Sequence, residues 1–81
     1  MPKPSPIGVR LGALIRERRV SKGITQIDLA KIARMPDTGL CMIETGKRAK
    51  RLDLDAMQRI AHALGFLSLA SMIARAEGRD A

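Results

Sequence analysis

The segment TQIDLAKIARMPDTGLCMIETG, residues 25–46, decides how this chain folds. It contains two short stretches with apolar residues at helical spacing, at about 26–33 and from about 37 to 44 or 45. Thr25 can cap the first stretch, because its side-chain oxygen can accept a backbone N–H of the first helical turn. Pro36 cannot continue the first helix and separates it from the second. The segment therefore predicts two short helices joined by a tight turn.

The second of these helices has clear ends but a weak middle. Asp37 favours its start, because a carboxylate complements the positive N-terminal end of a helix, and Gly46 stops it. Gly39 lies inside it and weakens it by roughly 0.5–1 kcal/mol relative to alanine. Arg34 stands in the turn, where a left-handed backbone would cost an arginine about 1 kcal/mol. Two helices with this separation form a helix-turn-helix, whose second helix can lie in the major groove of DNA.

Three further helices are predicted outside this segment. They run from about Ile7 to Lys22, ended by Gly23, from about Leu54 to Leu64, capped by Asp53, and from about Leu69 to Ala76, capped by Ser68. Residues expected to face inward are Leu11, Leu14, Ile15, Leu29, Ala30, Ala33, Leu40, Ile43, Leu54, Met57, Ile60, Ala61 and Leu64. Only 1% of the residues are aromatic, so the core must be aliphatic, which favours helices over strands.

The expected architecture is all-α, with one compact five-helix domain over residues 7–77. Eighty-one residues allow no second domain. Residues 1–6 hold three of the four prolines and one lysine, so a flexible basic proline-rich arm is expected there. Residues 78–81 are expected to fray as a short tail.

The charge of the chain is strongly positive. Fifteen Lys and Arg against eight Asp and Glu give a formal net charge of +7, which suits nucleic acid or an anionic membrane surface as a partner. The single cysteine, Cys41, excludes an internal disulfide and a cysteine-based zinc site. No apolar run is long enough to span a membrane, and the N-terminus lacks the apolar stretch of a secretory signal. A cytoplasmic, nucleoid-associated protein without a cofactor is therefore expected.

Several short strings of residues fall in the order and register of a known family. They are Leu11-Gly12, Ile15-Arg16, Arg19, Gly23, Thr25-Gln26, Leu29-Ala30, Ile43-Glu44, Gly46 and Ile60-Ala61-x-Ala63-Leu64-Gly65. Together they resemble the Cro/phage-repressor-like (Xre) helix-turn-helix family over about residues 9–70. The resemblance implies a lambda-repressor-like DNA-binding domain of bacterial or phage origin. It also implies a sequence-specific transcriptional regulator that binds double-stranded operator DNA.

The resemblance implies roles for individual residues of the helix-turn-helix. Asp37, Thr38 and Met42 occupy the positions that the family uses to touch bases. Gln26 would hydrogen-bond a phosphate and brace the recognition helix. None of the three base-facing residues is the Arg, Asn or Gln best suited to bidentate base reading. DNA shape and backbone contacts are therefore expected to carry more of the discrimination.

Two further groups of residues complete the expected site. Arg19 and Glu44 match a pair that forms a partly buried salt bridge in this family and ties the first helix to the end of the third. A basic loop follows the recognition helix, where the family contacts the DNA backbone, and it contains Lys47, Arg48, Lys50 and Arg51. An exposed charged loop without a partner is the alternative. The clustering of four cations beside the groove-facing helix favours a DNA contact.

The last predicted helix and the turn before it carry more apolar surface than one small domain needs. These residues are expected partly to cover the core and partly to pair with a second copy: Phe66, Leu67, Leu69, Met72 and Ile73. Family members commonly dimerise through this end, and a two-fold dimer reads a pseudo-palindromic operator. A homodimeric repressor or autoregulator is therefore the leading hypothesis.

One other class of function remains open. A chain that keeps the helix-turn-helix fold could act mainly through a protein partner, as an antitoxin bound by a toxin or as an interaction module. The reading face without Arg, Asn or Gln motivates this alternative. An enzyme is not expected, because the sequence offers no nucleophile–base pair, no phosphate-cradling glycine loop and no paired carboxylates. A metal site is not expected either, since His62 has no second histidine or cysteine at ligand spacing.

Overall fold

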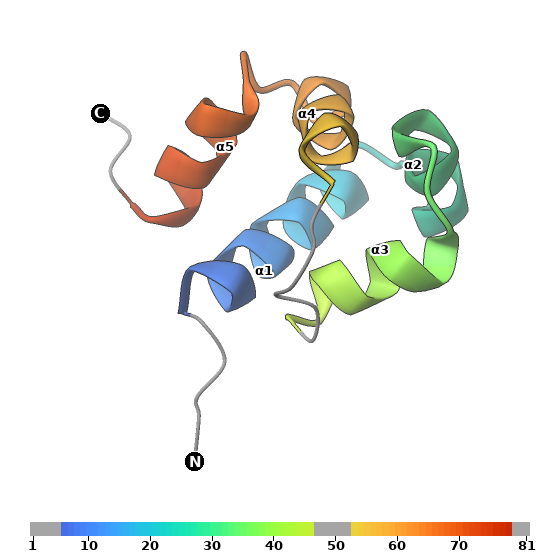
Figure 1. Cartoon of the computed structure of the whole chain (residues 1–81), viewed down its shortest axis with the longest axis horizontal. Helices are drawn as coiled ribbons and strands as arrows, with labels where there is room; N and C mark the ends of the chain where they lie inside the picture. Colours follow the sequence, from blue (N-terminus) through green and yellow to red (C-terminus); the bar gives the residue numbers. More distant parts are fainter. Residues whose placement is uncertain (1–5, 47–52, 79–81) are drawn as a thin grey trace.

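The computed structural model describes residues 6–46 and 53–78 of the chain. These residues form five helices and no strand: α1 (Pro6–Ser21), α2 (Gln26–Ala33), α3 (Asp37–Glu44), α4 (Leu54–Ala63) and α5 (Leu69–Ala76) (Figure 1). The all-α prediction is confirmed, and the bounds of the predicted helices differ from the observed ones by a residue at most. The N-terminal arm before Pro6, the basic loop and the tail from residue 79 lie outside the described residues.

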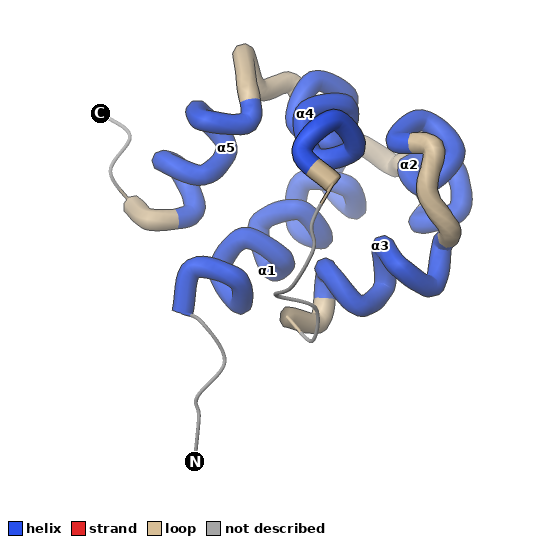
Figure 2. Tube along the Cα trace, viewed as in Figure 1, coloured by secondary structure: helices blue, strands red, loops and turns tan. Residues whose placement is uncertain are grey.

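The ends of the helices follow from local chemistry. The Thr25 hydroxyl accepts the backbone N–H of Asp28 at 3.1 Å and caps α2. The Ser68 hydroxyl accepts the backbone N–H of Ser71 at 3.1 Å and caps α5. Gly23 lies just beyond the end of α1 and stops the helix from continuing. Its φ is +71, a left-handed conformation that glycine adopts without strain. Short turns consequently join α1 to α2 and α2 to α3 (Figure 2).

The core lies between all five helices and is aliphatic. Its buried apolar residues are Leu11, Ile15, Leu29, Ala30, Ala33, Leu40, Ile43, Ala56, Met57, Ile60, Ala61, Leu64 and Met72. Leu54 was expected among them but is 70% exposed. It is the first residue of α4, where the helix extends beyond the core, and Ala56 and Met57 supply the buried contacts of that turn.

The crossing of α1 and α3 depends on Gly12, which is buried. A Cβ atom at this position would overlap the carbonyl oxygen of Ile43 and would lie 3.0 Å from the carbonyl oxygen of Glu44. Only glycine therefore allows the two backbones to approach this closely. The crossing fixes α3 against α1 along the side of α3 that faces the core.

The C-terminal end of the domain presents a mixture of core and surface residues. Phe66, Leu69 and Ile73 are half-buried and pack against the core. Leu67 is 90% exposed. Met72 was predicted to lie in a dimer interface, and this is wrong, because its side chain is fully buried in the core and out of reach of a second copy.

No helix in the described part of the chain combines the length and the apolar character needed to cross a membrane.

Candidate nucleic-acid interface

The helix α3 has one buried face and one exposed face. Leu40 and Ile43 are buried in the core. Asp37, Thr38 and Met42 are exposed, and the side chain of Met42 is 44% accessible to solvent. The geometry of 3.6 residues per turn places these three positions within one arc of the helix. The structure thus brings together on the solvent side the three residues that the sequence assigned to base contact.

The turn before α3 is tight and contains a residue in the left-handed conformation. Arg34 has φ +58, and it is the one non-glycine residue with positive φ in the described ranges. Its N–H donates to the carbonyl of Lys31 at 3.1 Å, and the N–H of Met35 donates to the carbonyl of Ala30 at 3.0 Å. These bonds close the end of α2 in the manner of a glycine cap. The chain then leaves in an extended conformation at Pro36, which starts α3.

Arg59 of α4 binds the backbone at the start of the same turn. Its Nε and Nη2 atoms donate to the carbonyl oxygen of Ala33 at 3.0 and 2.8 Å. Ala33 is the last residue of α2, so its carbonyl has no acceptor role within the helix. The sequence does not predict this contact, because no local pattern connects an arginine with a backbone carbonyl 26 residues earlier.

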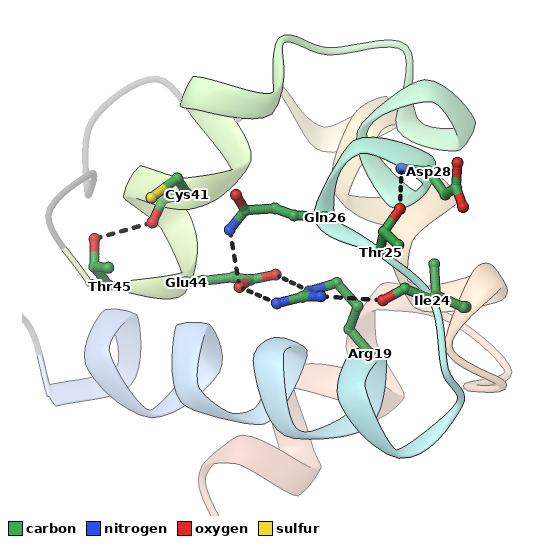
Figure 3. A network of polar contacts seen from close by, with 8 residues as sticks. All are labelled: Arg19, Ile24, Thr25, Gln26, Asp28, Cys41, Glu44 and Thr45. Carbon is green, nitrogen blue, oxygen red and sulfur yellow. Dashed lines mark hydrogen bonds and ion pairs between the residues drawn. The ribbon is translucent and has the colours of Figure 1, made fainter.

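The predicted ion pair between Arg19 and Glu44 is present (Figure 3). Arg19 Nε donates to Glu44 Oε2 at 2.7 Å, and Nη2 donates to Oε1 at 3.1 Å. A third bond runs from Nη1 to the carbonyl oxygen of Ile24 at 3.0 Å. The side chains are only 13% and 2% exposed, so both charges are shielded from water and are satisfied by each other. This bidentate pair joins α1 to the last residue of α3.

Gln26 joins the same network from the first turn of α2. Its Nε2 atom donates to Glu44 Oε1 at 3.2 Å, as Figure 3 shows. Glu44 therefore receives hydrogen bonds from α1 and from α2 at once. The predicted bracing of the recognition helix by Gln26 has this physical basis. The predicted contact of Gln26 with a phosphate stays a prediction.

The basic loop holds four of the predicted site residues. Lys47, Arg48, Lys50 and Arg51 fall outside the described residues. In the described ranges, no group of three His, Cys, Asp or Glu is placed to hold a metal ion.

The Arg18 guanidinium lies over the ring of Phe66, 4.9 Å from its centroid, and thereby ties α1 to the turn before α5.

Comparisons with known proteins agree with this geometry. A helix-turn-helix family model matches residues 15–71. A crystal structure of the clp gene regulator ClgR from Corynebacterium glutamicum is similar with a TM-score of 0.76 and 31% identity, covering 95% of this chain and 78% of that chain. A second crystal structure of ClgR has a TM-score of 0.74 and 31% identity, covering 99% of this chain and 97% of that chain. Among curated proteins, none matches.

Proposed function

Because this chain belongs to the Xre/Cro-like helix-turn-helix family of DNA-binding regulators, we propose that it controls transcription by inserting α3 into the major groove of an operator. The observation that carries the proposal is the two-faced α3. Glu44 anchors its end to Arg19 and Gln26, while Asp37 and Thr38 remain exposed. A major groove about 12 Å wide accepts a helix presented in this way. The family and the similar regulator give no support to an enzymatic role.

Base contacts are assigned to the exposed face of α3, and phosphate contacts to its flanks. Gln26 uses one of the two N–H donors of its amide toward Glu44. The second donor is proposed to bond a phosphate, which would link backbone contact with the network that holds α3. The basic residues Lys47, Arg48, Lys50 and Arg51 are proposed to contact the same DNA backbone beyond the end of α3.

A homodimer is the proposed active form. Phe66, Leu67, Leu69 and Ile73 form the proposed contact surface, and the 90% exposure of Leu67 supports it, because so large an apolar side chain gains by burial. Two copies related by a two-fold axis would read a pseudo-palindrome with half-sites about one helical turn, roughly 34 Å, apart. Binding of such a dimer over a promoter would repress or autoregulate transcription.

The oligomeric state tests the dimer assignment. Leu67→Asp should convert a dimer to a monomer in sedimentation or light-scattering measurements, because a carboxylate would have to be buried at the contact. Leu54→Asp is the matched control, since Leu54 is 70% exposed on α4 and outside the proposed surface. Unchanged mass for Leu67→Asp would contradict the assignment.

Titration against DNA tests the regulatory function itself. The full chain is titrated against duplexes from its own upstream region at several salt concentrations. Four to eight phosphate contacts per dimer predict a slope of log affinity against log salt of roughly −4 to −7. Arg48→Ala and Lys50→Ala should weaken all sequences about equally and make the slope shallower. A complete lack of saturable binding at low salt would contradict a DNA-binding function.

A further inference from the structure

We infer that the exposed face of α3 recognises the C5-methyl groups of pyrimidines in the major groove, so that thymines rather than guanines dominate the base contacts. This inference rests on the proposed function and names the base edges that the recognition helix takes. Thymine and 5-methylcytosine share this chemistry, since both present a methyl group at C5.

The exposed face of α3 lacks the side chains that read purines by two hydrogen bonds. The exposed residues of α3 and its C-terminal cap are Asp37, Thr38, Cys41, Met42 and Thr45. At 3.6 residues per turn they fall within an arc of about 140°. None of them carries a guanidinium, an ammonium or an amide. The face therefore has no two-donor group for guanine O6 and N7, and no amide for the N6 and N7 edge of adenine.

One of the two hydroxyls on this face already makes hydrogen bonds within the protein. The Thr45 hydroxyl donates to the carbonyl oxygens of Cys41 and Met42, at 3.0 and 3.2 Å (Figure 3 shows the first). A hydroxyl has one proton, so Thr45 has none left to donate to a base. Its methyl group is then the part of the side chain that can contribute to recognition. Thr38 remains as the one strong donor of this face.

Two further side chains give this face an exposed apolar surface. Met42 is 44% exposed, and its unbranched thioether adapts to irregular contacts. Exposed Cys41 lies one residue earlier and behaves as a small apolar side chain. Among the standard bases, only thymine offers an apolar group in the major groove. Contact between these side chains and thymine methyls removes both from water, which is favourable.

Asp37, at the start of the helix, adds a preference among base edges. Its carboxylate accepts hydrogen bonds and donates none when ionised. It therefore suits the amino groups of adenine and cytosine and is repelled by the two acceptors of guanine. A T·A pair presents the thymine methyl group and, beyond the thymine O4 acceptor, the adenine amino group from which Asp37 can accept. A pair of 5-methylcytosine with guanine provides the methyl group and the cytosine amino group.

The experiment compares duplexes that differ only in the C5-methyl group. Binding sites are first selected by the full chain from a random duplex library, and the preferred site is then synthesised with deoxyuridine in place of each thymidine in turn. Loss of one buried methyl should weaken binding about fourfold at the contacted positions. In a second arm, a contacted T·A pair is replaced by a C·G pair with and without a C5-methyl on cytosine. The methylated form should bind about fourfold more tightly than the unmethylated one.

Two variants assign the effect to α3. Met42→Ala should abolish the discrimination between thymine and uracil at the position it contacts. Ile32→Ala is the matched control, because Ile32 is 48% exposed on α2 and should leave the discrimination unchanged.

Equal binding of thymine and uracil duplexes at every position would overturn the inference while leaving DNA binding intact. Full methyl discrimination by Met42→Ala would overturn the assignment to this face. A library from which no duplex is enriched would overturn the proposed function, and the inference with it.

Discussion

The buried face of α3 and its exposed face belong to one helix of eight residues, yet their polar groups are treated differently. On the buried side, both oxygens of Glu44 accept hydrogen bonds from Arg19, and one of them also accepts from Gln26. On the exposed side, the described residues provide no side-chain hydrogen bond to Asp37 or Thr38. The protein's own hydrogen bonds therefore determine where the helix lies. The exposed polar side chains remain available to bind a ligand.

Removal of the buried carboxylate should cause the largest loss of stability. Glu44→Ala leaves the Arg19 guanidinium mostly buried without its partner, so the free energy of unfolding should fall by about 3–5 kcal/mol. Urea denaturation followed by circular dichroism measures this loss. Glu17→Ala is the control, because Glu17 is exposed on α1, and it should stay within about 0.5 kcal/mol of the parent. If the free energy of unfolding fell equally little for both variants, the buried Glu44 would contribute no more to stability than an exposed glutamate.

The next largest effect is expected where α3 crosses α1. Gly12→Ala places a Cβ atom against the carbonyl oxygen of Ile43, and backbone cannot yield as a side-chain tip can. The free energy of unfolding should fall by about 3 kcal/mol, the upper part of the usual range for overpacking. Gly23→Ala separates steric overlap from backbone strain, since φ is +71 there but nothing lies within 4 Å of the added Cβ. It should lose only about 1 kcal/mol. Equal losses would mean that the close approach is unimportant.

Relief of the strained turn should have a smaller effect of the opposite sign. Arg34→Gly removes the cost of a left-handed side-chain-bearing residue and adds some entropy to the unfolded chain. The net result should be a gain of about 0.5–1 kcal/mol in thermal or urea unfolding. Lys31→Gly, inside α2, should instead lose about 1 kcal/mol. A destabilised Arg34→Gly variant would show that the Arg34 side chain makes a contribution larger than the strain it imposes.

The sequence predicted the helices well because their ends depend on neighbouring residues. Thr25 and Ser68 supply caps within three residues of the N–H groups they bind, and a residue such as Gly23 ends a helix by its own conformation. The family resemblance supplied the pairing of Arg19 with Glu44, which spacing alone does not reveal.

Contacts between distant segments and polar backbone groups could not be predicted in this way. Gln58 Oε1 accepts the backbone N–H of Leu69 at 2.6 Å, and Arg59 binds the carbonyl of Ala33. Both contacts depend on how α4 packs, and no periodicity encodes them. The same limit explains the error at Met72, because the side of α5 that enters the core is fixed by its neighbours rather than by its own apolar pattern.

The exposed face should differ from all these positions in one respect: its variants change recognition without changing stability. Thr38→Ala should unfold within about 0.5 kcal/mol of the parent, because its side chain is exposed and supports no described contact. This effect on the free energy of unfolding is the smallest expected among these variants, and urea denaturation measures it.

The most direct test of the central claim is the affinity of Thr38→Ala for two duplexes of identical composition, the selected site and a shuffled version, at one salt concentration. The account predicts that affinity for the shuffled duplex stays the same, while the preference for the selected site falls about fivefold. Unchanged preference for the selected site would contradict the claim that the exposed face of α3 reads the bases.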